Sequence, residues 1–301
     1  MAERARASET VTAARSDFDR DTAVRPLEAE QGVQRDGELR FAAEVSPDWH
    51  GARGPHGGYV AAIIQRALGA SVGEERAPRS LTVHYARAPQ PGPAVIRVAP
   101  ERRGRSLSTL TARMEQDGAP VALALAAFSV AWSAPEIAEL GMPDVQPPDA
   151  TRESTGPLAQ RVKEGLAPPF LRQLVLQPRT AAVPFSGSNS AMEFGTWLGL
   201  RDPARPLDAV ALTMFCDVGM PPPFVRLSAP AMSSTIDLTI HYRTRLPRAG
   251  DHDPAELCFA RLRSSLLHEG FFECDSVVWA LDGTVLAHSR QLSVLMARAG
   301  A

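Results

Sequence analysis

The sequence lacks the features that mark several protein classes. Its three cysteines, Cys216, Cys258 and Cys274, lie far apart without a CxxC pair, which argues against a disulfide framework or a zinc site and favours buried, inert thiols. No stretch approaches about 18 uninterrupted apolar residues, so membrane insertion is not expected. The first residues also lack the apolar segment of a signal peptide, and we therefore expect a cytoplasmic protein.

The charge has no dominant sign either. The 32 Lys and Arg residues nearly balance the 34 Asp and Glu residues, giving a formal net charge of −2 at pH 7. Such a balance creates no field that would gather nucleic acid, so nucleic acid is not an expected partner. With 44% hydrophobic and 22% charged residues over 301 positions, the composition is that of a globular protein with room for two domains.

The first half of the chain predicts one strand, one helix and then a run of strands. Residues 38–45 alternate as a strand does, and the glycine-rich run 51–58 leads into a helix over residues 59–70. This helix is apolar on nearly all sides, which predicts that it is buried rather than laid on a surface. Four strands are predicted after it, over residues 80–85, 94–98, 106–114 and 121–130. Together they form an α+β unit.

The same order of elements returns in the second half. A strand is predicted over residues 191–200 and a buried helix over 207–216. Four more strands are predicted over residues 236–242, 256–264, 271–280 and 284–296. We therefore expect a tail (1–16), a first unit (17–132), a proline-rich linker with at most one short helix (133–184) and a second unit (185–301).

Short matching motifs indicate that the two units are copies of one fold. Residues 81–85 (LTVHY) align with 238–242 (LTIHY), about 160 positions later. An Asp-Gly turn follows in each half, at 117–118 and at 282–283, and residues 127–130 (AFSV) align with 291–294 (QLSV). The spacing between matched motifs changes only by loop insertions, as an internal duplication requires.

A duplicated strand, buried helix and antiparallel sheet resemble the double-hotdog acyl-CoA thioesterases of the thioesterase II group. The motifs that carry the resemblance are GPHGGYVAA at 54–62, STIDLTIHYR at 234–243, GFFECD at 270–275 and SRQLS at 289–293. The resemblance implies a tandem hotdog fold of the α+β class, a role in lipid metabolism, and hydrolysis of acyl-CoA without a metal, another cofactor or a covalent acyl-enzyme.

The resemblance also implies a set of catalytic residues that hold the attacking water. Asp237 matches the family's Asp and Gln291 its Gln, and the hydroxyl member falls at Ser264 or Ser265. A carboxylate at Asp237 can accept a proton from water that attacks a thioester carbonyl. Without the family resemblance, the pattern favours an Asp that hydrogen-bonds its own turn, whereas the resemblance, Gln291 and the difference between the two copies favour the catalytic interpretation.

The start of the first predicted helix is the candidate substrate-binding segment. Backbone N–H groups of Gly57, Gly58 and Tyr59, directly after His56, are unpaired donors at the positive end of a helix dipole and suit a developing oxyanion. As a pattern alone, the glycine run also fits a tight turn that admits a helix.

The two copies differ at the candidate catalytic positions. Where the second copy has Asp237 and Gln291, the first has Ser80 and Ala127. Both polar side chains are replaced together, which predicts a single active centre carried mainly by the second half. His84 and His241 are equivalent in the two copies, and we therefore interpret them as structural.

Other functions and partners remain open at this stage. One alternative is a non-catalytic protein that binds acyl chains or acyl-CoA. Another is a hotdog enoyl-CoA hydratase or dehydratase, against which stands the absence of an acidic residue after His56 in residues 57–69. The chain is expected to be a monomer or a homo-oligomer formed through sheet edges. Several arginines are candidates to contact the phosphates of CoA, although a solvated face is the better explanation of any single one: Arg102, Arg103, Arg105, Arg243 and Arg245.

Overall fold

The computed structural model describes residues 17–28, 37–165, 167–203, 205–248, 253 and 256–297. In the first half, its elements are α1 (Asp17–Asp21), β1 (Val24–Leu27), β2 (Leu39–Val45), η1 (Pro47–Trp49), α2 (Gly57–Ala70), β3 (Ala77–Tyr85), β4 (Gly92–Arg103), β5 (Leu107–Gln116) and β6 (Ala119–Ser129). The helix and the five strands predicted for this half are all present. Helix α2 begins at Gly57, so the two glycines belong to the helix itself.

The second half repeats this arrangement. Its elements are α3 (Gly156–Lys163), η2 (Pro169–Gln173), β7 (Leu174–Pro178), β8 (Glu193–Leu200), α4 (Ala209–Phe215), η3 (Pro222–Arg226), β9 (Ala231–Tyr242), β10 (Cys258–Arg263), β11 (Leu267–His268), β12 (Phe271–Trp279) and β13 (Val285–Ala297). Among the described residues, no helix combines the length and apolar character needed to cross a membrane.

The sequence analysis did not predict strands β1, β7 and β11 or the first five residues of β9. Strand β7 lies inside the segment that we expected to be a linker, and it pairs with β8. Strand β1 pairs with β2, and β9 begins at Ala231, five residues before its predicted start. Both β1 and β7 are short edge strands whose order depends on a neighbouring strand, so periodicity alone does not reveal them.

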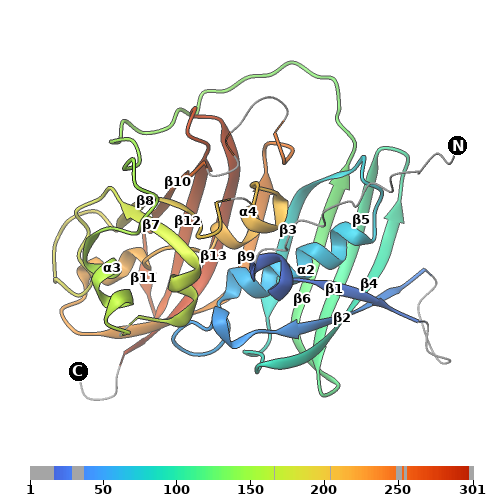
Figure 1. Cartoon of the computed structure of the whole chain (residues 1–301), viewed down its shortest axis with the longest axis horizontal. Helices are drawn as coiled ribbons and strands as arrows, with labels where there is room; N and C mark the ends of the chain where they lie inside the picture. The colour runs from blue at the N-terminus through green and yellow to red at the C-terminus, as the bar shows by residue number, and fades with distance from the viewer. Residues whose placement is uncertain are drawn as a thin grey trace, which may run out of the picture.

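The strands form one continuous antiparallel sheet with matching halves. Its order is β1-β2-β4-β5-β6-β3-β9-β13-β12-β10-β8-β7, with β11 on the side of β12. Each strand of the first half has a counterpart at the mirrored place in the second half, and β3 and β9 meet at the centre. The tandem hotdog prediction is thereby confirmed, and Figure 1 shows the single curved sheet with α2 and α4 on its inner side.

The pairing of β3 with β9 joins the two copies through their matching motifs. Leu81 lies opposite Ile240, and Thr82 lies opposite Thr239. The hydroxyls of these two threonines, which are equivalent positions of the repeat, are hydrogen-bonded at 3.1 Å. A residue that meets its own counterpart marks the pseudo-twofold axis, as in an isologous interface between two subunits.

The two central helices pack against each other inside the sheet. Ile63, Ile64 and Leu68 of α2 are fully buried, and burial stabilises the fold by about 1.5–3 kcal/mol for each such side chain. Close contact with α4 needs small residues on α2, because a Cβ atom at Gly58 would lie 2.7 Å from the backbone oxygen of Met214. Helices α2 and α4 lie side by side in Figure 1.

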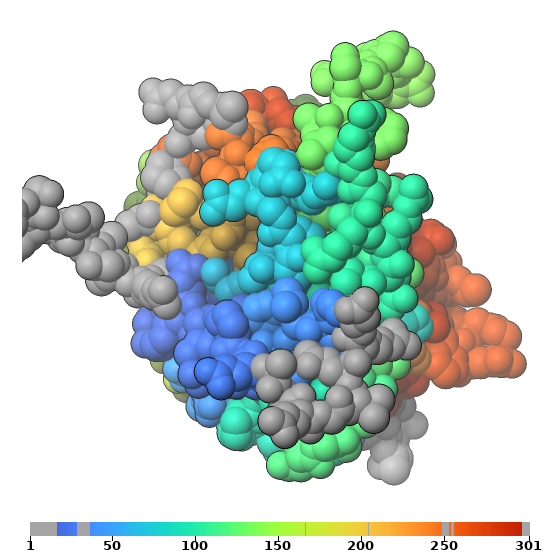
Figure 2. All heavy atoms as spheres, turned by 90° about the vertical axis from the view of Figure 1, so that its right-hand side faces the viewer, coloured from blue at the N-terminus to red at the C-terminus, as the bar shows by residue number. Residues whose placement is uncertain are grey.

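Helix α1 links the two halves by charge. The Asp19 carboxylate accepts hydrogen bonds from Arg66 of α2 at 2.7 Å and from Arg205 of the second half at 3.0 Å. The Arg205 guanidinium also lies over the Phe18 ring, 4.9 Å from its centroid. In Figure 2 these N-terminal residues, in blue, adjoin the gold residues of the second half.

The hydroxyl pair on the pseudo-twofold axis is testable by a double-mutant cycle. Thr82→Val and Thr239→Val each remove one hydroxyl and keep the β-branched shape, so the pair is expected to show a coupling free energy of about 0.2–1 kcal/mol in urea unfolding. Thr82→Val combined with Thr109→Val, a threonine on β5 two strands away, is the matched control and is expected to be additive. Additive effects of Thr82→Val and Thr239→Val on the free energy of unfolding would show that the hydroxyl contact does not stabilise the pairing of β3 with β9.

Candidate functional site

Backbone donors at the start of α2 form the first part of the site. The C=O of His56, the N-cap residue, accepts the N–H groups of Tyr59 and Val60 at 3.1 Å each. The Gly58 N–H donates instead to the Asp217 carboxylate at 2.7 Å. Within the described part of the chain, no hydrogen bond assigns an acceptor to the Gly57 N–H. One donor of the helix start is thus held by a carboxylate, and the one before it is free.

Asp217 reaches this helix start from the other half of the chain. It follows the C-cap residue of α4, and its side chain is only 7% exposed. The carboxylate also lies 3.6 Å from Nδ1 of His56, a buried nitrogen that has no hydrogen-bond partner among the described residues. A Cβ atom at Gly57 would lie 2.8 Å from the Asp217 carboxylate, so this approach requires glycine.

Burial shifts the pKa values of both side chains toward their neutral forms. Desolvation raises the pKa of Asp217, against the opposing effects of His56 and of the hydrogen bond from Gly58. Desolvation lowers the pKa of His56, although the charge of Asp217 opposes this shift. The site therefore places a neutral imidazole beside a carboxylate whose affinity for a proton is increased.

Two aromatic side chains enclose the pair. The Tyr85 hydroxyl donates to the Gly57 C=O at 2.9 Å, and burial, with the charges of Asp217 and Asp237, raises the pKa of Tyr85. The Phe170 ring, from the 3-10 turn η2, lies 4.3 Å from the His56 ring between centroids. These contacts fix the imidazole on one side and the helix start on the other.

Gln291 lies on the side of β13 that faces the helices. Its amide oxygen accepts a hydrogen bond from the Thr235 hydroxyl at 3.2 Å. Ser289, two residues earlier on the same face, donates to the backbone oxygen of Cys216 at 3.1 Å. Because Cys216 directly precedes Asp217, this face of β13 packs on the end of α4, and Gln291 belongs to the same side of the sheet as Asp217.

Asp237 is grouped with a different set of neighbours. It lies opposite His84 on β3 and opposite Leu292 on β13, and both of these side chains are exposed. Residues directly opposite each other in a ladder share a face, whereas Gln291 is one position from Leu292. The hydrogen bonds of the described residues do not link Asp237 to Gln291, and the catalytic role of Asp237 stays a prediction.

The two candidate serines are engaged with β12. The buried Ser264 donates its hydroxyl to the backbone oxygen of Glu273, and the exposed Ser265 donates its N–H to the Glu273 carboxylate. Neither serine is hydrogen-bonded to Gln291, whose hydroxyl partner is Thr235. The sequence comparison did not single out Thr235, although it lies only two positions before Asp237.

Tyr59 does not supply the free donor that the sequence suggested. Its N–H is already donated to the C=O of His56 at 3.1 Å. Its side chain turns into the core, where the ring stacks on Trp49 at 5.4 Å and the hydroxyl donates to the backbone oxygen of Asp21 at 2.7 Å. The helix geometry that uses the Tyr59 N–H internally leaves Gly57 and Gly58 as the outward donors.

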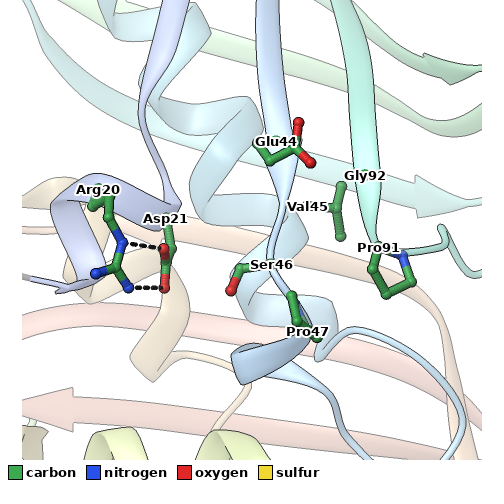
Figure 3. A pocket seen from close by; sticks show the side chains of 8 residues that line it. All are labelled: Arg20, Asp21, Glu44, Val45, Ser46, Pro47, Pro91 and Gly92. Carbon is green, nitrogen blue, oxygen red and sulfur yellow. Dashed lines mark hydrogen bonds and ion pairs between the residues drawn. The ribbon is translucent and has the colours of Figure 1, made fainter.

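A surface hollow in the first half lies apart from these residues. It is lined by Arg20, Asp21, Glu44, Val45, Ser46, Pro47, Pro91 and Gly92. Figure 3 shows the ion pair between Arg20 and Asp21 on one wall, with Glu44 and Val45 on the neighbouring strand. None of the candidate catalytic or substrate-binding residues lines this hollow, so it is not the candidate site.

Family models match both halves of the chain. A model of the acyl-CoA thioesterase N-terminal domain matches residues 45–129, and a model of the acyl-CoA thioesterase C-terminal domain matches residues 143–295. The chain belongs to the acyl-CoA thioesterase family. No curated protein matches this chain.

Solved structures of similar fold cover nearly all of this family member. A hot dog fold protein of unknown function from Alicyclobacillus acidocaldarius is 27% identical, with 94% of this chain and 99% of that one covered and a TM-score of 0.76. The acyl-CoA thioesterase II TesB2 of Mycobacterium marinum is 18% identical, with 94% and 100% covered and a TM-score of 0.70. At that identity, the second likeness concerns the fold alone.

The strand pairing refines the comparison between the two copies of this acyl-CoA thioesterase fold. Both copies have a bulge at the same place, at Arg79 in β3 and at Ile236 in β9. Counting from these bulges, the residue equivalent to Gln291 is the buried Ala126, one position from the Ala127 that the sequence alignment gave. The first half still has no amide at this place, so the difference between the copies remains.

Asp217 is the site residue that the sequence analysis missed. The search for an acidic partner of His56 was confined to residues 57–69 of the same helix, whereas the partner comes from the second copy. One signal was present in the sequence, since Asp217 is the first charged residue after the apolar run 209–216. Recognising it required the relative placement of α2 and α4.

The close approach at the site makes a prediction about glycine. Gly58→Ala would bring a Cβ atom to 2.7 Å from the backbone oxygen of Met214 and to 2.9 Å from the Cβ of Asp217, and we expect it to lower the free energy of unfolding by about 1–3 kcal/mol. Gly69→Ala, in the same helix with nothing within 4 Å, is the control and should raise stability by about 0.5–1 kcal/mol. Equal effects of the two variants in urea unfolding would contradict the tight contact.

Proposed function

We propose that this protein hydrolyses acyl-CoA to a free acid and CoA. The observation that carries the proposal is the free Gly57 N–H at the start of α2, next to a buried carboxylate from the second half. Both acyl-CoA thioesterase domains match the chain in the expected order, which supports a thioester of CoA as the substrate.

The start of α2 suits the carbonyl oxygen of a thioester. Attack by water converts this oxygen to an oxyanion, and a donor N–H at the positive end of a 14-residue helix stabilises negative charge there. Removing one such donor in other hydrolases costs about 3–4 kcal/mol of transition-state stabilisation. The missing side chain at Gly57 lets the thioester come close to the backbone.

The attacking water is proposed to be held by residues of the second half. The set is Asp237, Gln291 and one of Ser264 and Ser265, as the family resemblance implies. Of its members, Gln291 has the clearest structural support, because it lies on the helix-facing side and is oriented by Thr235. The expectation that no metal or other cofactor takes part belongs to the same proposal.

The His56–Asp217 pair also gives a specific reason to keep hydration of an enoyl-CoA as a second candidate. The sequence argued against it because no acidic residue followed His56, and the structure brings Asp217 to 3.6 Å from the imidazole. A hydratase would consume the enoyl double bond and release no thiol. Thiol release therefore separates the two reactions.

Thiol release from a chain-length series of acyl-CoAs tests the proposed function. Wild-type protein is expected to release CoA well above background from at least one member, and Gln291→Ala is expected to lower kcat/KM by about tenfold to a hundredfold because the water loses an orienting group. Gln160→Ala, which removes an exposed glutamine of α3, is the matched control and should leave kcat/KM unchanged.

Two other outcomes would replace the proposal. Binding of acyl-CoA without thiol release would make the protein an acyl-CoA binding protein. Loss of the double bond of an enoyl-CoA without thiol release would make it a hydratase. Thiol release, acyl-CoA binding and loss of the enoyl double bond are measured on the same samples. The combination of results then assigns one of the three functions.

A further inference from the structure

We propose that Asp217 is a further catalytic residue of this hydrolysis, the general base that takes the proton of the attacking water. The inference rests on the proposed function, because it assigns a group within the same reaction. It leaves the orientation of the water to Gln291, which lies on the side of the sheet that faces the end of α4.

Position is the first argument for Asp217. Gly57 and Gly58 are consecutive residues of one helical turn, and the second of them already holds the Asp217 carboxylate at 2.7 Å. A thioester carbonyl bound to the free N–H of Gly57 is therefore adjacent to the carboxylate. A base must lie within hydrogen-bonding reach of the water that attacks this carbonyl, and the contact with Gly58 puts the Asp217 carboxylate beside the helix start where that water would be bound.

The second argument is the surroundings of the carboxylate. Asp217 and His56 come from different halves and are almost fully enclosed, with side-chain exposures of 7% and 12%. Gly58 supplies the only hydrogen bond to the Asp217 carboxylate among the described residues, so further lone pairs remain for water. A buried carboxylate with unused acceptor capacity beside a helix start is arranged to receive a proton.

The third argument is the comparison with Asp237. The strand register groups Asp237 with the exposed His84 and Leu292, whereas Ser289 and Gln291 face the end of α4, where Asp217 begins. Water oriented by the amide of Gln291 is consequently on the Asp217 side of the sheet. His56 is a positioning residue, since its ring lies against the Asp217 carboxylate, with Nδ1 at 3.6 Å.

The proton and the electrons balance in this scheme. The oxygen of water forms a bond to the carbonyl carbon, the π electrons move to the carbonyl oxygen, and one proton of the water passes to Asp217. The oxyanion then re-forms the carbonyl and the C–S bond breaks, with its electron pair leaving on sulfur. Transfer of the proton from Asp217 to the thiolate gives a carboxylic acid and CoA thiol, and it regenerates the carboxylate.

The pH dependence of the rate follows from the groups around Asp217. Those that face it are His56 before α2, Tyr85 on β3, Cys216 at the end of α4 and Cys274 on β12. Burial raises the pKa of Tyr85 and of both thiols, to about 12 for Cys274, so these groups stay neutral near pH 7. Because the raised pKa of Asp217 must be exceeded for it to act as base, kcat/KM is expected to fall as the pH drops through that value.

Replacement of the carboxylate by an amide is the direct test. Asp217→Asn keeps an oxygen that can accept the Gly58 N–H, but it cannot take a proton. We expect kcat to fall by about a hundredfold or more, while the melting temperature and the Kd for a non-hydrolysable acyl-CoA thioether stay near wild-type values. Asp208→Asn, at the N-cap of the same helix α4, is the matched control and should retain activity because Asn also caps helices.

The acid limb of the pH profile distinguishes the two carboxylates. It should persist in Asp237→Asn and disappear from the residual activity of Asp217→Asn. Asp217→Glu, which keeps the charge and moves it by one methylene, should lower kcat by about tenfold and retain the acid limb of the pH profile. If Asp217→Asn does not fold, the pH profile of Asp217→Glu is the test of the base.

The outcomes separate failure of the inference from failure of the proposed function. Wild-type kcat or an unchanged acid limb in Asp217→Asn, or loss of the acid limb in Asp217→Glu, would overturn the role of Asp217 and leave the hydrolase intact. Absence of thiol release from every acyl-CoA by the wild-type protein would instead remove the proposed function, and the role of Asp217 with it.

Discussion

The antiparallel pairing of β3 with β9 is the constraint on which the rest of the structure depends. It joins two copies of one fold at equivalent residues, with Thr82 bonded to Thr239 on the axis, and so converts two half-sheets into one. In the joined sheet, α2 and α4 lie next to each other, so close that a Cβ atom at Gly58 would lie 2.7 Å from the backbone oxygen of Met214. The candidate site forms where the start of α2, from the first copy, meets the end of α4, from the second copy. Neither copy alone contains both of these segments.

A duplicated fold offers two pseudo-equivalent places for such a site, and in this chain the two places differ in their side chains. The place at the start of α2 has the glycines of the first copy and, from the second copy, Asp217 and the Thr235–Gln291 pair. In the first copy, Pro78 and Ala126 stand where the second has Thr235 and Gln291, as the shared bulges establish. Proline and alanine offer no side-chain hydrogen bond, so the mirrored place lacks the groups that would orient a water.

The sequence predicted the fold well because its strongest signals are local. The buried helices, the interior strands and the repeated LTxHY motif are all properties of short windows, and they fix the tandem arrangement. Strands β1 and β7 were not predicted, because they are stabilised by pairing with a neighbouring strand and have no strong alternating pattern of their own. The site was harder, since the acidic partner of His56 lies in the other copy, and since a one-residue bulge decides which face of β9 a side chain takes.

The position of Asp217 also explains how a carboxylate can remain in the interior at all. An unpaired buried charge is costly, and here the compensation is a backbone N–H together with the positive end of the α2 dipole, worth about 2 kcal/mol at most in a partly buried geometry. That support is incomplete, which is why the pKa of Asp217 remains raised. A carboxylate secured by several donors would be a weak base, and one with no donor would be protonated at neutral pH. A single helix-start donor therefore leaves the carboxylate with a greater affinity for a proton than a fully hydrogen-bonded carboxylate has.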